Sequence, residues 1–217
     1  MECTLVSDPH LIEHVISFTS VRAPYGWLGN MSPHPISAED AIWSTAEALF
    51  QALRFAPSHP ARDLIRAERG PMAAKMVAKH RESEMAVKPQ SSEDLDLMRR
   101  VIRLKITQHP TLKKQLLATE SVRLIEDVSR RWNKGSAMFW GARQTDRGWL
   151  GRNWLGYLWM ELREDLQKSN PPAPCDPVDA CETHGRCWTH SEWARCSCGE
   201  IVDGLDGLCG HCRERLP

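Results

Sequence analysis

The 217-residue chain balances 28 Lys and Arg against 28 Asp and Glu and is 41% hydrophobic. That composition is typical of a globular protein with room for one domain and an appendage. No run of 18 uncharged apolar residues occurs, which argues against a membrane-spanning helix, and the first 18 residues hold no basic leader. We therefore expect a cytoplasmic protein without a secretory signal.

Apolar spacing and capping residues predict a mainly α body with a few short strands, an α+β fold. Strand candidates are the apolar runs at 14–20 and 122–128. The predicted helices cover 44–55, 59–70, 71–82, 94–109, 111–119 and 155–166. Pro60 and Pro71 are placed at helix starts, and Ser91 begins a capping signal. No Gly-rich loop follows a strand, which excludes a P-loop and a Rossmann fingerprint.

A row of polar residues marks the predicted helix 44–55. Glu47, Gln51 and Arg54 follow one another at helical spacing, beside an apolar stripe. The row is either the floor of a functional site or a buried Glu–Arg pair that holds two helices together, and the spacing alone fits both.

Charge and aromatic residues gather in the second half of the body. Residues 99–163 contain 14 Lys and Arg against 5 Asp and Glu, which suits a phosphate-bearing ligand or, equally, a solvated helix face. Asn153 is placed to cap the last helix, whose N-terminus beside Arg147 and Arg152 is a candidate anion site. Trp140, Trp149, Trp154 and Tyr25 are candidates for stacking on a base, with core or interface packing as the alternative.

An ordered set of motifs over 18–166 resembles the NADAR family, the YbiA-like N-glycosidases. In chain order the motifs are Phe18-Thr19-Ser20, Tyr25-Gly26, Gly29-Asn30-Met31-Ser32, Trp43-Ser44-Thr45-Ala46-Glu47, Phe50-Gln51-Ala52, Phe55, Ile65, Pro71, Ala74-Lys75, Met98-Arg99-Arg100, Leu104-Lys105, Leu116-Leu117-Ala118-Thr119, Leu124-Ile125-Glu126, Trp140-Gly141, Gly151-Arg152-Asn153, Leu155-Gly156, Leu158, Met160, Leu162-Arg163 and Leu166. The resemblance implies a compact, mainly helical fold. It also implies hydrolysis of an N-glycosidic bond in a ribose-phosphate or ADP-ribose adduct, which is either a riboflavin intermediate or ADP-ribosylated guanine in nucleic acid.

The resemblance gives the polar row a role. Cleaving an N-glycosidic bond builds positive charge at the anomeric carbon, so a carboxylate, here Glu47, is expected to stabilise that charge or activate water. The residues expected to bind substrate are Asn30, Trp43, Gln51, Arg54, Arg99, Arg100, Lys105, Trp140, Gly141, Arg152 and Asn153. Within that set, Asn30 and Asn153 are expected to bind ribose or base, and Arg99, Arg100, Lys105 and Arg152 are phosphate candidates.

Three positions depart from the family pattern. Arg54 stands where Lys is common, Ala137 where Asp is frequent three residues before Trp-Gly, and Ala142 where a polar residue usually follows it. Asp127 or Asp146 are candidate replacements for the missing carboxylate. The alternative function is a non-catalytic module that binds ADP-ribose or a nucleotide.

Cysteine use divides the chain. Seven of the eight cysteines lie within the last 43 residues, after a Pro-rich linker at 169–174. We therefore predict two units, 1–168 and 175–217. Cys196, Cys198, Cys209 and Cys212 have the spacing of a zinc ribbon, a closed structural site of four thiolates. A possible second set is Cys181, His184, Cys187 and His190. The tail holds 4 basic and 8 acidic residues, which argues against a strong DNA clamp and leaves partner docking as the expectation.

Overall fold

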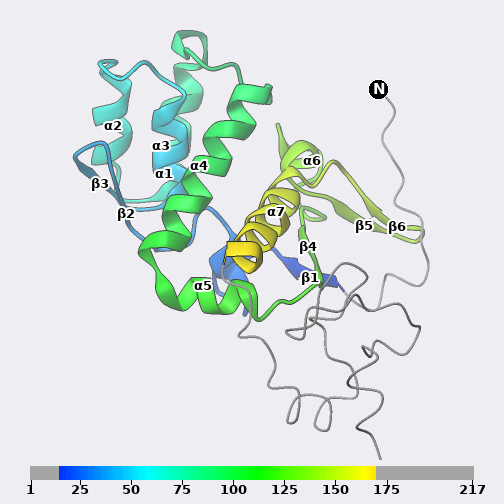
Figure 1. The fold of residues 1–217 in the computed structure, drawn as a ribbon. Coiled ribbons are helices and arrows are strands. Elements are labelled where there is room, and N and C mark those ends of the chain that lie inside the picture. The colour runs from blue at the N-terminus through cyan, green and yellow to red at the C-terminus, as the bar shows by residue number, and fades with distance from the viewer. Residues whose placement is uncertain (1–14, 170–217) are drawn as a thin grey trace, which may run out of the picture. The chain divides into compact units, whose positions relative to one another are not determined.

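The computed structural model describes residues 15–169 and shows a mainly helical body with a few short strands (Figure 1). The helices are α1 (Ala46–Leu53), α2 (Ala61–Ala67), α3 (Pro71–His80), α4 (Ser92–Gln108), α5 (Pro110–Leu117), α6 (Ala137–Trp140) and α7 (Trp154–Ser169), with 3-10 turns at Gly26–Leu28 and Glu82–Glu84. The strands are β1 (Val15–Phe18), β2 (Ile36–Ala38), β3 (Ala41–Trp43), β4 (Arg123–Glu126), β5 (Arg143–Thr145) and β6 (Gly148–Leu150). The predicted mainly α fold is confirmed for this part of the chain. Ser169, the first residue of the predicted linker, is the last residue of α7, whereas residues 170–174 of the linker and the cysteine tail lie outside the described residues.

The strands pair two by two. β1 and β4, the two strand candidates of the sequence, run parallel, and their register places Phe18 opposite Glu126. β2 and β3 form an antiparallel hairpin that leads into α1, and β5 pairs with β6 before α7 begins.

Helix α1 is the centre of the helical layer. It packs against α2, α3 and α4, which surround it in Figure 1. Thr45 caps it, because the Thr45 hydroxyl accepts a hydrogen bond from the backbone N–H of Ala48 at 3.2 Å. Every residue of α1 is buried, including Glu47 and Gln51. A fully buried helix must satisfy its polar side chains internally, and that requirement defines the polar cluster of the next section.

Two glycines let chain segments approach β4 closely. A Cβ at Gly141 would lie 2.4 Å from the carbonyl oxygen of Glu126, and one at Gly156 would lie 2.2 Å from that of Leu124. Asn153 joins the same strand to the start of α7: its side chain accepts from Glu126 N–H at 3.0 Å and donates to Leu124 C=O at 2.9 Å. These contacts fix the position of Glu126 at the end of β4.

Lys105 anchors the loop that precedes the β2–β3 hairpin. The side chain is completely buried, and its Nζ donates to the carbonyl oxygens of Trp27 at 2.5 Å and Gly29 at 3.1 Å. The same nitrogen lies 2.7 Å from the hydroxyl oxygen of Ser32. Burial lowers the pKa of Lys105 to about 7.

Among the helices of residues 15–169, none combines the length and the hydrophobicity that a membrane span requires.

Candidate active site

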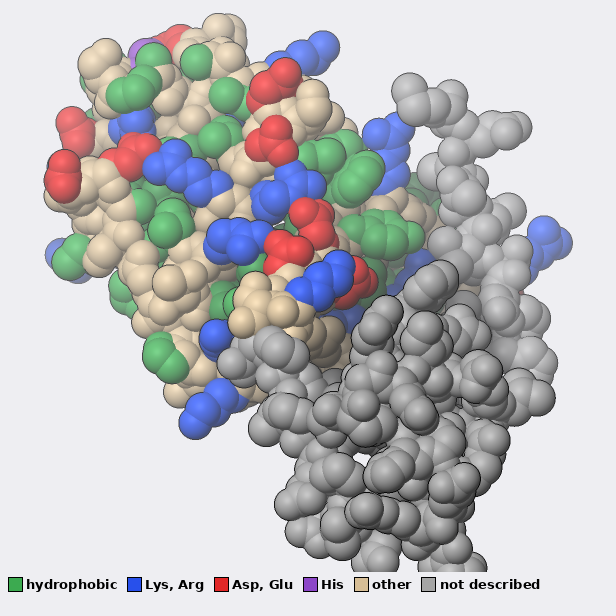
Figure 2. Space-filling model, in the orientation of Figure 1, with side chains coloured by type: hydrophobic (Ala, Val, Ile, Leu, Met, Phe, Trp, Pro, Cys, Tyr) green, Lys and Arg blue, Asp and Glu red, His purple; other side chains and the backbone are tan. Residues whose placement is uncertain are grey.

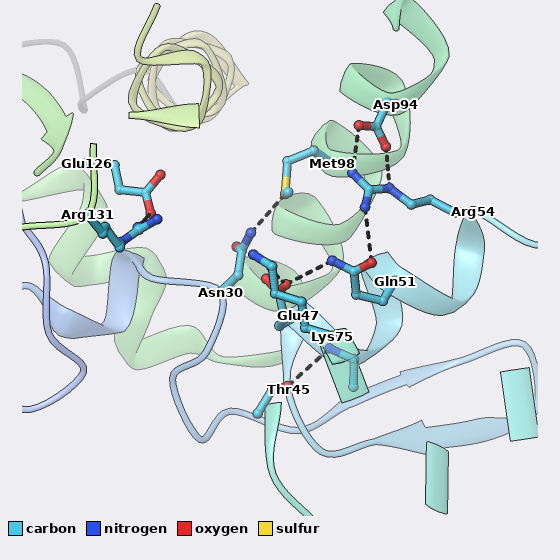
Figure 3. A network of polar contacts seen from close by, with 11 residues as sticks. Asn30, Thr45, Glu47, Gln51, Arg54, Lys75, Asp94, Met98, Glu126 and Arg131 are labelled. Carbon is cyan, nitrogen blue, oxygen red and sulfur yellow. Dashed lines mark hydrogen bonds and ion pairs between the residues drawn. The ribbon is translucent and has the colours of Figure 1, made fainter. Parts of the chain in front are cut away.

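The polar row on α1 forms one continuous hydrogen-bonded chain (Figure 3). Gln51 donates from Nε2 to Oε1 of Glu47 at 2.9 Å, and Arg54 donates from Nη1 to Oε1 of Gln51 at 3.0 Å. All three side chains are buried. Gln51 thus uses both ends of its amide to connect a carboxylate to a guanidinium.

The Arg54 end of the chain is closed by a carboxylate from α4. Arg54 donates from Nε and Nη2 to the two oxygens of Asp94, each at 2.8 Å. Asp94 also accepts from the backbone N–H of Gln90 at 2.7 Å, and the guanidinium lies 4.3 Å from the centre of the Phe50 ring. This buried bidentate ion pair joins α1 to α4. Because Nε, Nη1 and Nη2 of Arg54 each donate to a protein acceptor, the guanidinium is satisfied without a ligand.

The Glu47 end reaches the surface. Lys75 of α3 places its Nζ 3.5 Å from Oε1 of Glu47, and the Lys75 side chain is 39% exposed whereas that of Glu47 is 7% exposed. Both described contacts of the carboxylate use Oε1, which leaves Oε2 for a substrate atom or water. Lys75 is not among the site residues that the sequence singles out, although it belongs to a family motif. The sequence feature that could have pointed to Lys75 is the pair of small residues beside it, Ala74 and Ala78. Both are buried, and their small size lets α3 pack closely on α1.

Asn30 lies beside Glu47, as its predicted role in substrate binding requires. Its backbone carbonyl accepts from the N–H of Glu47 at 2.9 Å. Within the described part of the chain, its side-chain Nδ2 contacts only a weak acceptor, the sulfur of Met98 at 3.2 Å, and its Oδ1 is buried without a partner. An orphaned buried amide oxygen is an acceptor for a substrate hydroxyl or amine.

A second carboxyl group, Glu126, lies within electrostatic range of Glu47 and Lys75. In Figure 3 its side chain extends from the end of β4 toward the side on which Asn30 and Glu47 lie. Arg131 donates to Oε1 at 2.5 Å, whereas Oε2 is buried and has no hydrogen-bond partner among residues 15–169. Burial raises the pKa of Glu126; Arg131 lowers this pKa, the Glu47 carboxylate raises it, and Lys75 lowers it. In the sequence Glu126 stands out only as a family motif residue, and the available signal was a charged residue that ends an apolar strand.

Of the predicted aromatic residues, Trp140 packs directly on α1. Trp140 makes an edge contact with Phe50 of α1, with ring centres 5.5 Å apart, and a second one with Phe139. Trp43 is buried at the end of β3 and donates to the carbonyl of Ala38 at 3.2 Å. Gly141 supports the close approach to Glu126 described above. Arg152 is exposed, and its guanidinium lies 5.7 Å from the centre of the Phe139 ring. Its role as a phosphate ligand stays a prediction.

Four other predicted ligands have protein partners outside this chain of hydrogen bonds. Arg99 pairs with Glu161 at 2.7 Å and Asp96 at 2.5 Å, and Arg100 donates to Glu39 at 3.2 Å. The face drawn in Figure 2 shows Lys and Arg side chains interleaved with Asp and Glu, as expected for a solvated helix face. Lys105 holds the 27–32 loop, and the Asn153 side chain bonds to β4 instead of capping α7. Their roles toward a substrate remain predictions from the sequence.

The departures from the family pattern have a structural setting. Ala137 and Ala142 are buried, and Ala142 pairs with Asp127 in a β-bridge. The Asp127 carboxylate accepts from the N–H of Ser129 at 2.8 Å, which is a local turn. Of the carboxyl groups in this segment, Glu126 rather than Asp127 has an oxygen that is buried and unpartnered.

The predicted zinc ligands Cys196, Cys198, Cys209 and Cys212 lie outside the described residues, as do Cys181, His184, Cys187 and His190. Within 15–169, no cluster of three or more His, Cys, Asp or Glu side chains is arranged to hold a metal ion.

Comparison with known proteins places the fold and the site in a family. The NADAR domain profile matches residues 17–167. N-glycosidase YbiA of Escherichia coli is 33% identical over 152 residues, which cover 70% of this chain and 88% of that protein. The riboflavin biosynthesis protein PYRR of maize is 29% identical over 171 residues, covering 73% of this chain and 26% of that longer protein. The NMR structure of E. coli YbiA superposes with a TM-score of 0.60 at 31% identity, covering 75% of this chain and 90% of that one.

The profile match extends over most of the chain, and the relatives named as N-glycosidases align along nearly their whole length. The sequence motifs that carry the resemblance fall within the matched range. This chain belongs to the NADAR family, and its relatives support a glycosidase-type function.

Proposed function

We propose that the protein is an N-glycosidase that cleaves the bond between a base-like nitrogen and the anomeric carbon of a ribose phosphate or ADP-ribose. The observation that carries the proposal is the Glu47 carboxylate, held through Oε1 by Gln51 at 2.9 Å and approached by Lys75 at 3.5 Å. A carboxylate with one oxygen fixed and the other free is suited to a carbon that becomes positive as the bond to nitrogen breaks.

The proposed chemical step is the breaking of the C–N bond at the sugar. The electron pair of the C–N bond leaves with the nitrogen, and the sugar passes through an oxocarbenium-like state. Glu47 stabilises that charge or takes a proton from the water that adds to the carbon. Asn30, whose Oδ1 is an unused acceptor, is placed to bind a ribose hydroxyl. Lys75 orients the Glu47 carboxylate and offers a positive charge to substrate phosphate.

Two substrate classes follow from the resemblance and from the relatives. Relatives named for riboflavin biosynthesis in maize and Vibrio vulnificus favour a phosphoribosyl-aminopyrimidine. ADP-ribosylated guanine in nucleic acid is the other class, and the basic surplus of residues 99–163 is compatible with its phosphates.

Incubation with both substrates tests the proposal. The full chain, a Glu47→Gln variant and a matched surface control, Glu82→Gln, are mixed with phosphoribosyl-aminopyrimidine and with an oligonucleotide carrying ADP-ribosylated guanine. We expect ribose 5-phosphate or ADP-ribose to be released by the parent protein and by Glu82→Gln, but not by Glu47→Gln. Tight binding without turnover by the parent protein would instead indicate a non-catalytic reader of these ligands.

We also propose that the cysteine tail binds structural zinc through Cys196, Cys198, Cys209 and Cys212 and serves as a docking module. Four thiolates at ribbon spacing leave no open coordination position, and a segment of this length gains its stability from the metal. Elemental analysis of protein purified under reducing conditions should give at least one zinc per chain, and substitution of Cys209 by Ser should lower that value. A parent protein free of zinc would refute the ribbon.

A further inference from the structure

Glu126 is a carboxyl group in the proposed site to which the reaction, as described above, assigns no task. N-glycosidic cleavage needs two proton operations: one at the water that attacks the sugar and one at the nitrogen that departs. Glu47 serves the first. A neutral base leaves poorly as an anion, so the second calls for an acid close to the departing nitrogen.

The surroundings of Glu126 suit that second task. Arg131 holds Oε1 at 2.5 Å, which fixes the direction of the carboxyl group, and Oε2 is buried with no partner. Gly141 packs directly against the Glu126 backbone, where the Cβ of any larger residue would collide with the Glu126 carbonyl oxygen. An acid held by one oxygen and unpartnered at the other is arranged to give a proton to a ligand.

We propose that Glu126 is the general acid of this site, donating its proton from Oε2 to the leaving nitrogen while Glu47 acts at the sugar. As the C–N bond breaks, its electron pair and the Glu126 proton go to the nitrogen, so the base leaves neutral. Water adds to the anomeric carbon and gives its proton to Glu47. Exchange of that proton with solvent and reprotonation of Glu126 restore the starting state, and the sum is hydrolysis.

The charged groups that face Glu126 act on its pKa in opposite directions: the Glu47 carboxylate raises the pKa, whereas Arg131 and Lys75 lower it. Glu47 on α1 and Lys75 on α3 act from the helical side and Arg131 from the following loop, and burial, the largest influence, raises the pKa of Glu126. A group with a raised pKa holds its proton to higher pH, so the rate should fall as the pH rises through that pKa.

This inference rests on the proposed N-glycosidase function, and leaving-group chemistry separates the two. The substrate that the parent protein cleaves is compared with the same substrate carrying an N-methylated base. The methylated base is cationic and departs neutral without a proton. Rates are measured against pH for the parent protein and for the Glu126→Gln, Glu47→Gln and Glu82→Gln variants. The amide oxygen that Glu126→Gln introduces can still accept from Arg131, so the variant preserves that contact.

We expect Glu126→Gln to slow cleavage of the unmethylated substrate by about 10² to 10³-fold and that of the methylated substrate by less than about 10-fold. In the Glu126→Gln variant, the cleavage rate should no longer fall as the pH rises. Glu47→Gln should slow both substrates alike, and Glu82→Gln neither. In the parent protein itself, the alkaline loss should be present with the unmethylated base and absent with the methylated one, a readout that needs no variant to fold.

Two results would overturn the acid role while leaving the glycosidase function standing. One is an equal loss of cleavage rate on both substrates in Glu126→Gln. The other is a parent protein whose rate with the methylated base still falls at alkaline pH. A parent protein that cleaves neither substrate would remove both.

Discussion

The two ends of the polar row on α1 differ in what surrounds them. At one end, Arg54 meets both oxygens of Asp94 at 2.8 Å and is buried. At the other end, the contacts of Glu47 with described residues use one carboxylate oxygen, and its cationic neighbour Lys75 is 39% exposed. One helix stripe thus holds a closed structural pair and an open carboxylate about two turns apart. Helical spacing therefore identifies a polar row but not its task, which is decided by the partners on neighbouring elements.

The largest expected effect is a loss of turnover at the Glu47 end of the row. Glu47→Gln keeps the shape of the side chain and its contact with Gln51, so the variant should fold normally while its turnover falls by about 10³-fold or more. The measurement is kcat/KM on the cleaved substrate together with the urea midpoint. Lost turnover accompanied by lost stability would mean that Glu47 is a structural residue like Arg54.

At the Arg54 end we expect a loss of stability instead of a loss of turnover. Arg54→Met leaves the Asp94 carboxylate buried and unpaired, which should lower the free energy of unfolding by about 3 kcal/mol. Adding Asp94→Asn removes the orphaned charge but retains an acceptor for Gln90, so the double variant should be more stable than Arg54→Met alone. Urea denaturation measures both.

If Arg54 instead binds substrate, as the sequence predicts, Arg54→Met would raise KM steeply with little loss of stability, and the double variant would recover nothing.

Lys105 gives a pH test of the structural side. Because the native pKa is lowered to about 7 from its ordinary value of 10.5, the unfolded chain binds more protons between these values. The free energy of unfolding should therefore rise with pH above 7, by at most about 1.4 kcal/mol per pH unit from this group. Lys105→Met should remove that increment. Denaturation curves at about pH 7.5 and about pH 9 for both proteins give the two slopes, and equal slopes would contradict the burial effect.

The weakest effect should come from Lys75→Arg, which keeps a cation beside Glu47. If Lys75 orients Glu47 and binds phosphate, kcat/KM should change by less than about 10-fold, whereas Lys75→Met should lose more. A Lys75→Arg protein as impaired as Lys75→Met, together with a substrate adduct trapped on Lys75 by borohydride, would show that the amine attacks the sugar directly.

Local signals predicted the helices but not the partners that complete the site. The capping signal at Ser91 and the proline at the start of α3 concern residues a few positions apart, and those predictions agree with α3 and α4. The Arg54–Asp94 pair joins residues 40 positions apart, a distance over which periodicity carries no information.

The same limit explains the residues that the sequence did not single out. Lys75 becomes relevant only because α3 packs on α1, and Glu126 only because the end of β4 lies within electrostatic range of Glu47 and Lys75. Asn153 was expected to cap α7, yet its side chain satisfies two backbone groups of β4. A short polar side chain at a helix start has several backbone groups within reach, and tertiary packing selects among them.

The position of the sugar relative to residue 47 is the decisive observation for the proposed chemistry. A crystal structure of Glu47→Gln soaked with the uncleaved substrate should show the residue 47 side chain hydrogen-bonded to a water that lies about 3.5 Å from the anomeric carbon, on the face opposite the departing base. A substrate bound with its anomeric carbon beyond reach of α1, or a residue 47 side chain that remains turned toward Gln51 and Lys75 with the sugar elsewhere, would contradict it.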